Sequence, residues 1–181
     1  MNQLTSTYLT ALRQVIWQRP EEFDFPSEKA RLWLLEPGSL SRLLERHCQT
    51  LSVDLLHNGE IPAAQLDQQE IELLSAESCL LRKVVLSGDL HAWVLGRTLI
   101  PRSSLLDQPY DLAQQGEIPL GLTVFSAENV TRDAMQVGWI DCEQGRLLAR
   151  RSRLWMNHKP MLVAELFLPH APIYAKEKVN D

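Results

Sequence analysis

Three charged side chains lie in segments of the sequence that otherwise have the composition of buried strands. They are Glu165, Arg82 and Arg97, and each has an apolar residue two positions before it and two positions after it. Because side chains alternate between the two faces of a strand, each charge shares a face with apolar neighbours two positions away. A carboxylate and two guanidinium groups in such places have the chemistry to bind an anion and to move a proton.

Burying these charges without partners would be costly, so their positions need an explanation. One interpretation is an internal network of arginine–glutamate salt bridges that serves the fold alone. The other is a buried pocket for an anion, in which arginines bind a carboxylate and the acid moves a proton or orients the ligand. Alternation does not separate the two, because both need the same residues buried. Three further arginines, Arg150, Arg151 and Arg153, we interpret mainly as a solvated basic stripe, with a supporting role in anion binding as the alternative.

Other common catalytic and binding motifs are missing from the sequence. There is no glycine-rich dinucleotide fingerprint and no P-loop, so we predict no nucleotide cofactor. The three cysteines, Cys48, Cys79 and Cys142, have none of the spacings of metal sites, and we predict no metal. None of the five histidines has a serine or cysteine partner that the sequence identifies, which leaves a nucleophilic triad without support.

Composition and charge narrow the class of protein. A chain of 181 residues with 45% hydrophobic and 23% charged residues suits one soluble domain. Its net charge of −5 argues against a nucleic-acid partner. No apolar run reaches the length of about 18 residues that a membrane span needs, and the first residues lack the pattern of a signal peptide. We therefore expect a cytoplasmic protein with reduced cysteines, and we expect it to act as a monomer.

Periodicity indicates the elements that would position the charged residues. Before residue 48, apolar residues recur at helical spacing, first in a helix that Pro20 ends and then in a region broken at Pro37-Gly38, after which Ser39 can cap a helix. From residue 51 the period changes to two. The predicted strands are residues 51–59, 79–89, 91–101, 131–141, 145–156 and 160–169.

Short turns connect most of these strands. Turn signals occur at Asn58-Gly59, at Gly88-Asp89, near residues 143–145 and at residues 157–160. Tight turns imply antiparallel pairing, so we predict an α+β fold with a single six-stranded antiparallel sheet and helices packed on one of its faces. The chain is predicted to be a single domain, 1–181, with a helical N-terminal part at 1–48, the sheet with inserted helices at 51–168, and a polar, fraying tail at 170–181.

Several short motifs occur together, in one order, over residues 78–174. They are Gly96-Arg97-Thr98 followed by Pro101, Pro119-Leu120-Gly121, Thr131-Arg132-Asp133, Arg151-Ser152-Arg153 and the run from Glu165 to Pro169. In sequence and spacing this region resembles the chorismate pyruvate-lyase family, the 4-hydroxybenzoate synthases. The resemblance implies a six-stranded antiparallel sheet and a small enclosed site. It also implies conversion of chorismate into 4-hydroxybenzoate and pyruvate without a cofactor, as the first step toward ubiquinone.

The resemblance further implies which residues contact the ligand. Arg82 corresponds to the arginine that binds the substrate carboxylate, and Glu165 corresponds to the acidic residue of the family. Leu120 corresponds to a leucine that contributes through its backbone, and Gly121 after it would allow close approach. Leu40, in the helical part of the chain, is implied as a further contact.

Two roles are open for Glu165 in such a reaction. It could act as a general acid toward the enol ether, or it could accept a hydrogen bond from the ring hydroxyl and so orient the substrate. In both cases Arg82 would bind a carboxylate. We expect Arg97 to hold Glu165 or Arg82 in place.

A non-enzymatic protein of the same fold is the alternative. Such a binding module for a small aromatic or carboxylate ligand serves as the effector domain of some bacterial transcription regulators. Those regulators carry a DNA-binding domain on the same chain, whereas residues 1–50 here have the apolar pattern of core-packing helices. A lyase-like protein that binds a relative of chorismate without turnover is a third reading. Formation of 4-hydroxybenzoate from chorismate would separate the enzyme from both.

Overall fold

A computed structural model describes residues 2–106, 111–125 and 129–176 of the chain. The strands are β1 (Leu51–Ile61), β2 (Cys79–Gly88), β3 (His91–Pro101), β4 (Val130–Cys142), β5 (Gly145–Met156) and β6 (Lys159–Phe167). The α-helices are α1 (Gln3–Arg13), α2 (Glu28–Leu34), α3 (Leu40–Glu45), α4 (Gln68–Leu73), α5 (Arg102–Leu105) and α6 (Leu120–Val124). Short 3-10 helices lie at Pro20–Glu22, Ala63–Gln65, Leu112–Gln114 and Pro172–Tyr174.

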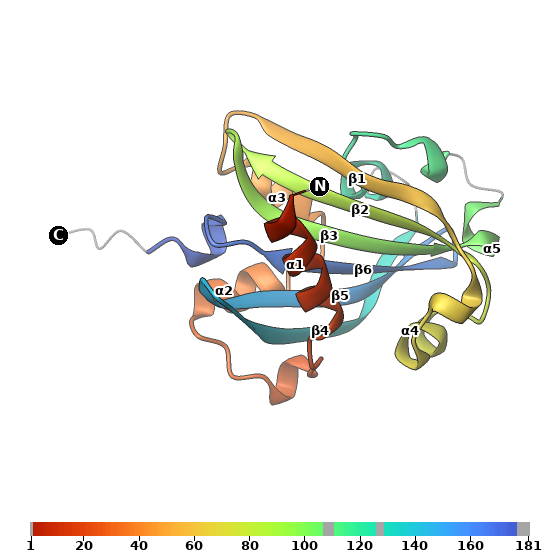
Figure 1. The fold of residues 1–181 in the computed structure, drawn as a ribbon, viewed down its shortest axis with the longest axis horizontal. Helices are drawn as coiled ribbons and strands as arrows, with labels where there is room; N and C mark the ends of the chain where they lie inside the picture. The colour runs from red at the N-terminus through yellow and green to blue at the C-terminus, as the bar shows by residue number, and fades with distance from the viewer. Residues whose placement is uncertain (1, 107–110, 126–128, 177–181) are drawn as a thin grey trace.

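All six strands belong to one sheet in the order β1-β2-β3-β6-β5-β4, and every neighbouring pair is antiparallel (Figure 1). The first three strands make one half of the sheet and the last three make the other. The pairing of β3 with β6 joins the two halves at the centre. The predicted α+β fold with one six-stranded antiparallel sheet is therefore confirmed.

Most of the predicted hairpins are present. β2 and β3 are joined through Asp89 and Leu90, both with positive φ, and β4 and β5 meet next to Gly145, whose φ is +110°. The turn predicted at Asn58-Gly59 is wrong, because β1 runs through both residues and pairs them with β2 as far as Ile61. A register shift between Leu55 and His57 is the only irregularity recorded within this pairing.

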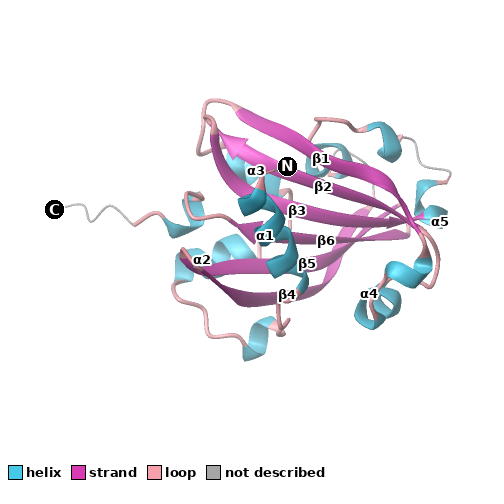
Figure 2. Ribbon diagram, in the orientation of Figure 1, coloured by secondary structure: helices cyan, strands magenta, loops and turns pink. Residues whose placement is uncertain are grey.

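Helices pack on both faces of the sheet, not on one as predicted (Figures 1 and 2). On one face, Tyr8, Leu9 and Leu12 of α1 pack against apolar residues of β3, β5 and β6. On the other face, α2 and α3 pack against a cluster that includes Phe167 and Val94. Both faces of the central strands carry apolar side chains, so burying only one would leave the other in water.

The N-terminal helix is shorter than predicted. α1 ends at Arg13, and the chain continues in an extended form in which the backbone N–H and C=O of Gln18 both bond to Val137 of β4, at 2.8 and 2.9 Å. Gly138 permits this close approach, because a Cβ atom there would lie 2.6 Å from a methyl group of Val15. This contact draws the segment after α1 against the sheet.

The predicted cap at Ser39 is present, and part of the tail packs against the rest of the protein. Ser39 caps α3 as expected, since its hydroxyl accepts a hydrogen bond from the Arg42 N–H at 3.3 Å. The first part of the predicted tail does not fray, because it packs against the rest of the protein. Ile173 is only 4% exposed, and the Tyr174 hydroxyl donates to the Phe167 carbonyl at 2.7 Å. Residues 177–181 of the predicted tail lie outside the described part of the chain.

Candidate active site

A two-residue turn brings the acid of β6 opposite an arginine of β5. Asn157 and His158 connect the strands with φ values of +51° and +62°, which is the backbone of a type I′ hairpin turn. A turn of this kind sets the register of the whole hairpin, and it pairs Arg150 with Glu165. Directly opposed residues in an antiparallel pair point to the same face of the sheet.

Arg150 and Glu165 form a buried ion pair. The Arg150 Nε and Nη2 atoms each lie 3.3 Å from Glu165 Oε2, and the exposed fractions of the two residues are 0% and 6%. Arg150 Nη1 also donates to the backbone carbonyl of Glu36 at 3.0 Å. The arginine therefore sets the orientation of the carboxylate and ties it to the segment that precedes α3.

The pairing of β6 with β3 and of β3 with β2 relates Glu165 to Arg82 through two rows of residues that lie opposite one another across the strands. Gly96 of β3 lies opposite Glu165, and in the next row Arg82 of β2 lies opposite Thr98 of β3. The alternation of the strands places Arg82 on the same face as Glu165. With strands about 4.8 Å apart and a rise of about 3.3 Å per residue, the Cα atoms of Arg82 and Glu165 are about 12 Å apart.

A cavity lies over these rows, on the face covered by α3 and α6. It sits between two apolar clusters, one packed by α2 and α3 and one that includes Val124 of α6. Its charged lining residues are Arg132, Arg150 and Glu165. Its other lining residues are Leu40, Ser41, Val84, Leu86, Val94, Gly96, Thr98, Leu120, Phe125, Leu154 and Val163.

Arg82 lies on the cavity face, next to its wall. It is 2% exposed, and its Nη2 donates to the backbone carbonyl of Ile118 at 2.9 Å. Its Nη1 is buried and has no hydrogen-bond partner in the described part of the chain. Burial lowers the pKa of Arg82 from its usual value. A buried guanidinium with a free donor next to a cavity has the chemistry to receive an anion.

Arg132 is a second cation in the cavity wall, and sequence reasoning missed it. Its guanidinium donates to the backbone carbonyls of Pro37 and Gly38, at 3.2 and 3.0 Å, and to the Ser152 hydroxyl. Burial, together with the nearby charge of Arg150, lowers the pKa of Arg132 to about 10. None of its recorded hydrogen bonds goes to a carboxylate, so within the described residues its charge is only partly compensated.

The remaining predicted contacts lie in the cover of the cavity. Leu40 is the first residue of α3, is 5% exposed and lines the cavity. Leu120, also in the lining, is the first residue of α6, and Gly121 follows it in that helix. The structure thus brings Leu40, Leu120 and Glu165 together around one cavity, with Arg82 beside it.

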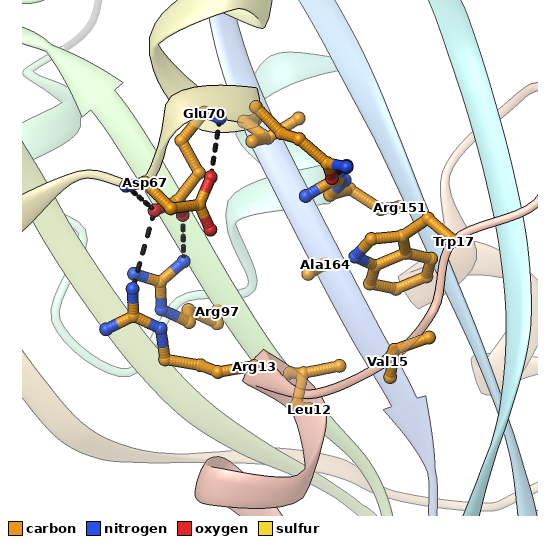
Figure 3. Close-up of a pocket in the computed structure, with 11 residues that line it drawn as sticks. Leu12, Arg13, Val15, Trp17, Asp67, Glu70, Arg97, Arg151 and Ala164 are labelled. Atoms are coloured by element: carbon orange, nitrogen blue, oxygen red, sulfur yellow. Dashed lines mark hydrogen bonds and ion pairs between the residues drawn. The ribbon is translucent and has the colours of Figure 1, made fainter.

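The expectation for Arg97 is wrong. In β3 it lies opposite Ala164, one residue from Glu165, and therefore points to the opposite face of the sheet. Its Nη1 lies 2.5 Å from Glu70 Oε2 of α4, as Figure 3 shows. It cannot hold Arg82 or Glu165 from there. The periodicity of the sequence does not predict the helix α4 that supplies this partner.

The basic stripe predicted at residues 150–153 is not solvated. Arg150 is 0% exposed on the cavity face, and Arg151 is 5% exposed on the other face. Arg153 remains partly exposed and pairs with Asp133 through two hydrogen bonds of 2.8 Å. The prediction failed because it assumed one solvated face, whereas helices cover both. The signal that could have found Arg150 was the short turn at 157–158, which sets the pairing with Glu165.

The described part of the chain contains neither a metal site nor a membrane-spanning helix. Within residues 2–106, 111–125 and 129–176, no three histidine, cysteine or acidic side chains gather in a way that could hold a metal ion. Over the same part of the chain, no helix has the length and hydropathy to cross a membrane.

Known proteins resemble this chain along almost its whole length. Residues 11–179 match the protein family described as chorismate lyase. A protein of Vibrio parahaemolyticus named "Probable chorismate pyruvate-lyase" is 66% identical over 179 residues, which is 99% of this chain and 100% of that protein. A protein of Hamiltonella defensa named "Chorismate pyruvate-lyase" is 38% identical over 92% of this chain and 93% of its own length.

Solved structures of low sequence identity share the fold. A gene product of Staphylococcus aureus superposes with a TM-score of 0.54 at 13% identity, over 78% of this chain and 95% of that one. The effector domain of PhnF from Mycobacterium smegmatis superposes with a TM-score of 0.50 at 12% identity, over 73% and 89% of the two chains. At such low identity the likeness concerns the fold alone.

Proposed function

The chain belongs to the chorismate lyase family, and from that premise we propose that it converts chorismate into 4-hydroxybenzoate and pyruvate. The observation that carries the proposal is the charge of the cavity face. Three buried or partly buried arginines, Arg82, Arg132 and Arg150, face one carboxylate in the cavity lining, Glu165, while Glu36 acts on Arg132 from the segment before α3. Chorismate carries two carboxylates, and its negative charge would offset the excess of positive charge around the cavity.

Arg82 binds one of these carboxylates in the proposed complex. Its buried Nη1 is free to donate, while its Nη2 keeps the contact with the Ile118 carbonyl. Leu120 and Gly121 begin α6, where the first backbone N–H groups of a helix have no partner within the helix. These groups add donors to the same carboxylate. Leu40 contributes an apolar contact from the other side of the cover.

Arg132 binds the second carboxylate, that of the enolpyruvyl group. It lines the cavity, and its recorded partners are two backbone carbonyls and a hydroxyl. With a pKa of about 10 it is a cation at neutral pH. An arginine that has been desolvated without a carboxylate partner gains more from an incoming anion than an exposed one does.

The chemistry itself needs little more than orientation and the transfer of one hydrogen. The bond between C3 of the ring and the ether oxygen breaks, and the hydrogen at C4 leaves as the ring becomes aromatic. The enolpyruvyl methylene gains a hydrogen, which turns the departing group into pyruvate. This hydrogen passes either within the substrate or by way of a side chain, and no oxidant or reductant is consumed.

Glu165 is the residue of this chain placed to assist. It acts as a general acid toward the enol ether, or it accepts the hydrogen bond of the ring hydroxyl and fixes the position of the ring. Arg150 Nε donates a hydrogen bond to its Oε2 at 3.3 Å and Arg150 Nη2 lies at the same distance as an ion-pair contact, which supports a single orientation of the carboxylate. We assign Glu165 and Arg82 as the catalytic and substrate-binding groups and Arg150 as the residue that positions Glu165.

Three further features belong to the proposal. The reaction proceeds without a cofactor, since the chain's own side chains supply the donors and the acid that it needs. It takes place in the cytoplasm, which the three free cysteines support, and the protein acts as a monomer. The product 4-hydroxybenzoate enters ubiquinone biosynthesis, as the resemblance to the family implies.

A turnover assay tests the proposal directly. The purified protein is incubated with chorismate, without added metal or nucleotide, and the absorbance of 4-hydroxybenzoate is followed. We expect product to form with the wild type and to be lost with Glu165→Ala. Tight binding of chorismate without any 4-hydroxybenzoate would instead identify a binding module of the same fold.

A further inference from the structure

A second cavity lies on the opposite face of the sheet, between α1, α4 and the strands β3, β5 and β6 (Figure 3). Leu162 and Ala164 of β6 form its apolar floor. Trp17 and Arg151 make one side, while Arg97 and Glu70 make the other. None of these residues belongs to the candidate active site.

Arg97 is one of two buried cations that line this cavity, and two of its nitrogen atoms make no hydrogen bond within the described part of the chain. It is 6% exposed, and its recorded partner is the carboxylate of Glu70. Its Nε and Nη2 atoms are buried and have no hydrogen-bond partner in the described part of the chain. Leaving a buried guanidinium nitrogen without an acceptor is costly, so an incoming acceptor would stabilise the protein.

The carboxylate of Glu70 also interacts with groups other than Arg97. It also lies 3.5 Å from Arg13 Nη2, and its Oε1 accepts a hydrogen bond from the Asp67 N–H at 3.0 Å as part of the helix cap of α4. Asp67 in turn accepts from the Glu70 N–H at 2.8 Å. The carboxylate of Glu70 thus pairs with two arginines and accepts a hydrogen bond from one backbone N–H.

Positive charge is in excess around this carboxylate. Lys83 lies opposite Arg97 in the β2–β3 pair, and burial together with the charges of Arg97 and Arg13 lowers its pKa. Across the cavity, Arg151 is 5% exposed, and its recorded hydrogen bonds go to the neutral amides of Gln136 and Gln69.

Arg151 is also held in place by stacking. Its guanidinium lies 4.9 Å from the ring centre of Trp17, a contact that the pairing of Gln18 with β4 makes possible. The cations of this region are Arg13, Lys83, Arg97 and Arg151, and its acids are Glu70 and Asp67. The net charge of these six side chains is therefore +2, with Asp67 and Glu70 as the acids that act on Arg151 as well.

We propose that this second cavity is a binding site for a single small oxyanion, a carboxylate or a phosphate, held between Arg97 and Arg151. Guanidinium groups bind both kinds of anion through paired N–H donors, and desolvation of both arginines strengthens the attraction. Trp17 and the floor of Leu162 and Ala164 would contact an apolar group attached to the anion. The proposal concerns a face of the sheet that the chemistry on chorismate does not use, so it does not depend on the proposed function.

Thermal unfolding and calorimetric titration test the site, with inorganic phosphate and pyruvate as the two probes in a buffer free of other oxyanions. We expect saturable binding of at least one probe, with a matching rise in Tm. Arg151→Gln should weaken binding about tenfold or more, because it removes a charged donor whose present partners are neutral. The probe that binds more tightly identifies the class of anion.

Two control variants keep the result unambiguous. Arg153→Gln removes an arginine from the same strand that does not line the cavity, and it should bind as the wild type does. Arg82→Gln removes an anion-binding group of the other face and should also leave this binding intact. If Arg82→Gln abolishes binding while Arg151→Gln retains it, the anion occupies the other cavity and the proposal is wrong. Absence of saturable binding with either probe would likewise overturn it and leave the network with a purely structural role.

Discussion

Arg150 and Glu165 face each other across β5 and β6, with two guanidinium nitrogens 3.3 Å from one carboxylate oxygen, in the interior of the protein. The pair is a structural unit as well as a functional one. A buried ion pair adds little stability compared with apolar residues of similar size, but removing one partner leaves the other charge uncompensated. Stability and activity should therefore respond differently to changes at these two positions.

Replacing Glu165 with alanine is expected to remove turnover and to reduce stability. Loss of an acid or orienting group should lower kcat by about 100-fold or more. The unpaired Arg150 should cost about 3–5 kcal/mol of unfolding free energy. Chorismate turnover and urea denaturation measure the two effects. The double variant Arg150→Met, Glu165→Ala should regain part of the stability and none of the activity. A normal kcat in Glu165→Ala would remove this residue from the mechanism.

Replacing Arg82 with alanine is expected to act chiefly on substrate binding. A hydrogen bond to a charged group is worth about 1.5–3 kcal/mol, so KM for chorismate should rise roughly ten- to a hundredfold. Steady-state kinetics measures this change, and Arg146→Gln, an exposed arginine stacked on Trp139, is the matched control that should behave as wild type. An unchanged KM in Arg82→Ala would show that the substrate carboxylate binds elsewhere.

Replacing Arg132 with glutamine is expected to discriminate between substrate and product. Chorismate has two carboxylates and 4-hydroxybenzoate has one, so KM should rise by about tenfold while inhibition by 4-hydroxybenzoate changes little. Ser152→Ala removes one hydrogen-bond acceptor of Arg132 and keeps its charge, and it should affect KM far less. Equal weakening of both ligands in Arg132→Gln would contradict a role in binding the enolpyruvyl carboxylate.

Stability is expected to fall in alkaline solution because of Cys79. This thiol is 0% exposed, and burial raises its pKa from 9.0 to about 11. Between these two values the unfolded chain loses a proton that the folded protein keeps, so the unfolding free energy falls as pH rises. The loss should be on the order of 2 kcal/mol across this window.

Chemical denaturation at pH 8 and pH 11 measures this loss, and the comparison with Cys79→Ala isolates it. The variant should be less stable at pH 8 because of its cavity, but it should lose less stability on the way to pH 11. Parallel losses in the two proteins would assign the alkaline effect to other groups.

The sheet was predictable because its signals are local. Alternating apolar residues mark the strands, and turns at Asp89-Leu90 and Asn157-His158 fix antiparallel neighbours. The placement of helices on both faces was not predictable in the same way, since it depends on contacts between distant segments. The error at Asn58-Gly59 has the same origin, because pairing with the long strand β2 overrides a local turn preference.

The candidate site was predictable in part for a similar reason. Alternation indicates that Arg82 and Glu165 are buried, but it does not say which face of the sheet a buried charge occupies. Arg97 is one residue out of phase with Glu165 across the β3–β6 pair, and this pairing is set by the tertiary fold. Arg132 was harder still, since β4 shifts register between Asp133 and Gln136 and so interrupts the alternation near it.

The central position of β6 affects how the protein folds during its synthesis. Arg82 is contributed by one half of the sheet and Arg150 by the other, and β6, the last strand of the chain, lies between β3 and β5 and joins them. During synthesis β3 and β5 each keep one edge unpaired until residues 159–167 leave the ribosome. The two halves of the sheet can join only after β6 has been synthesised, so the active site forms late in folding.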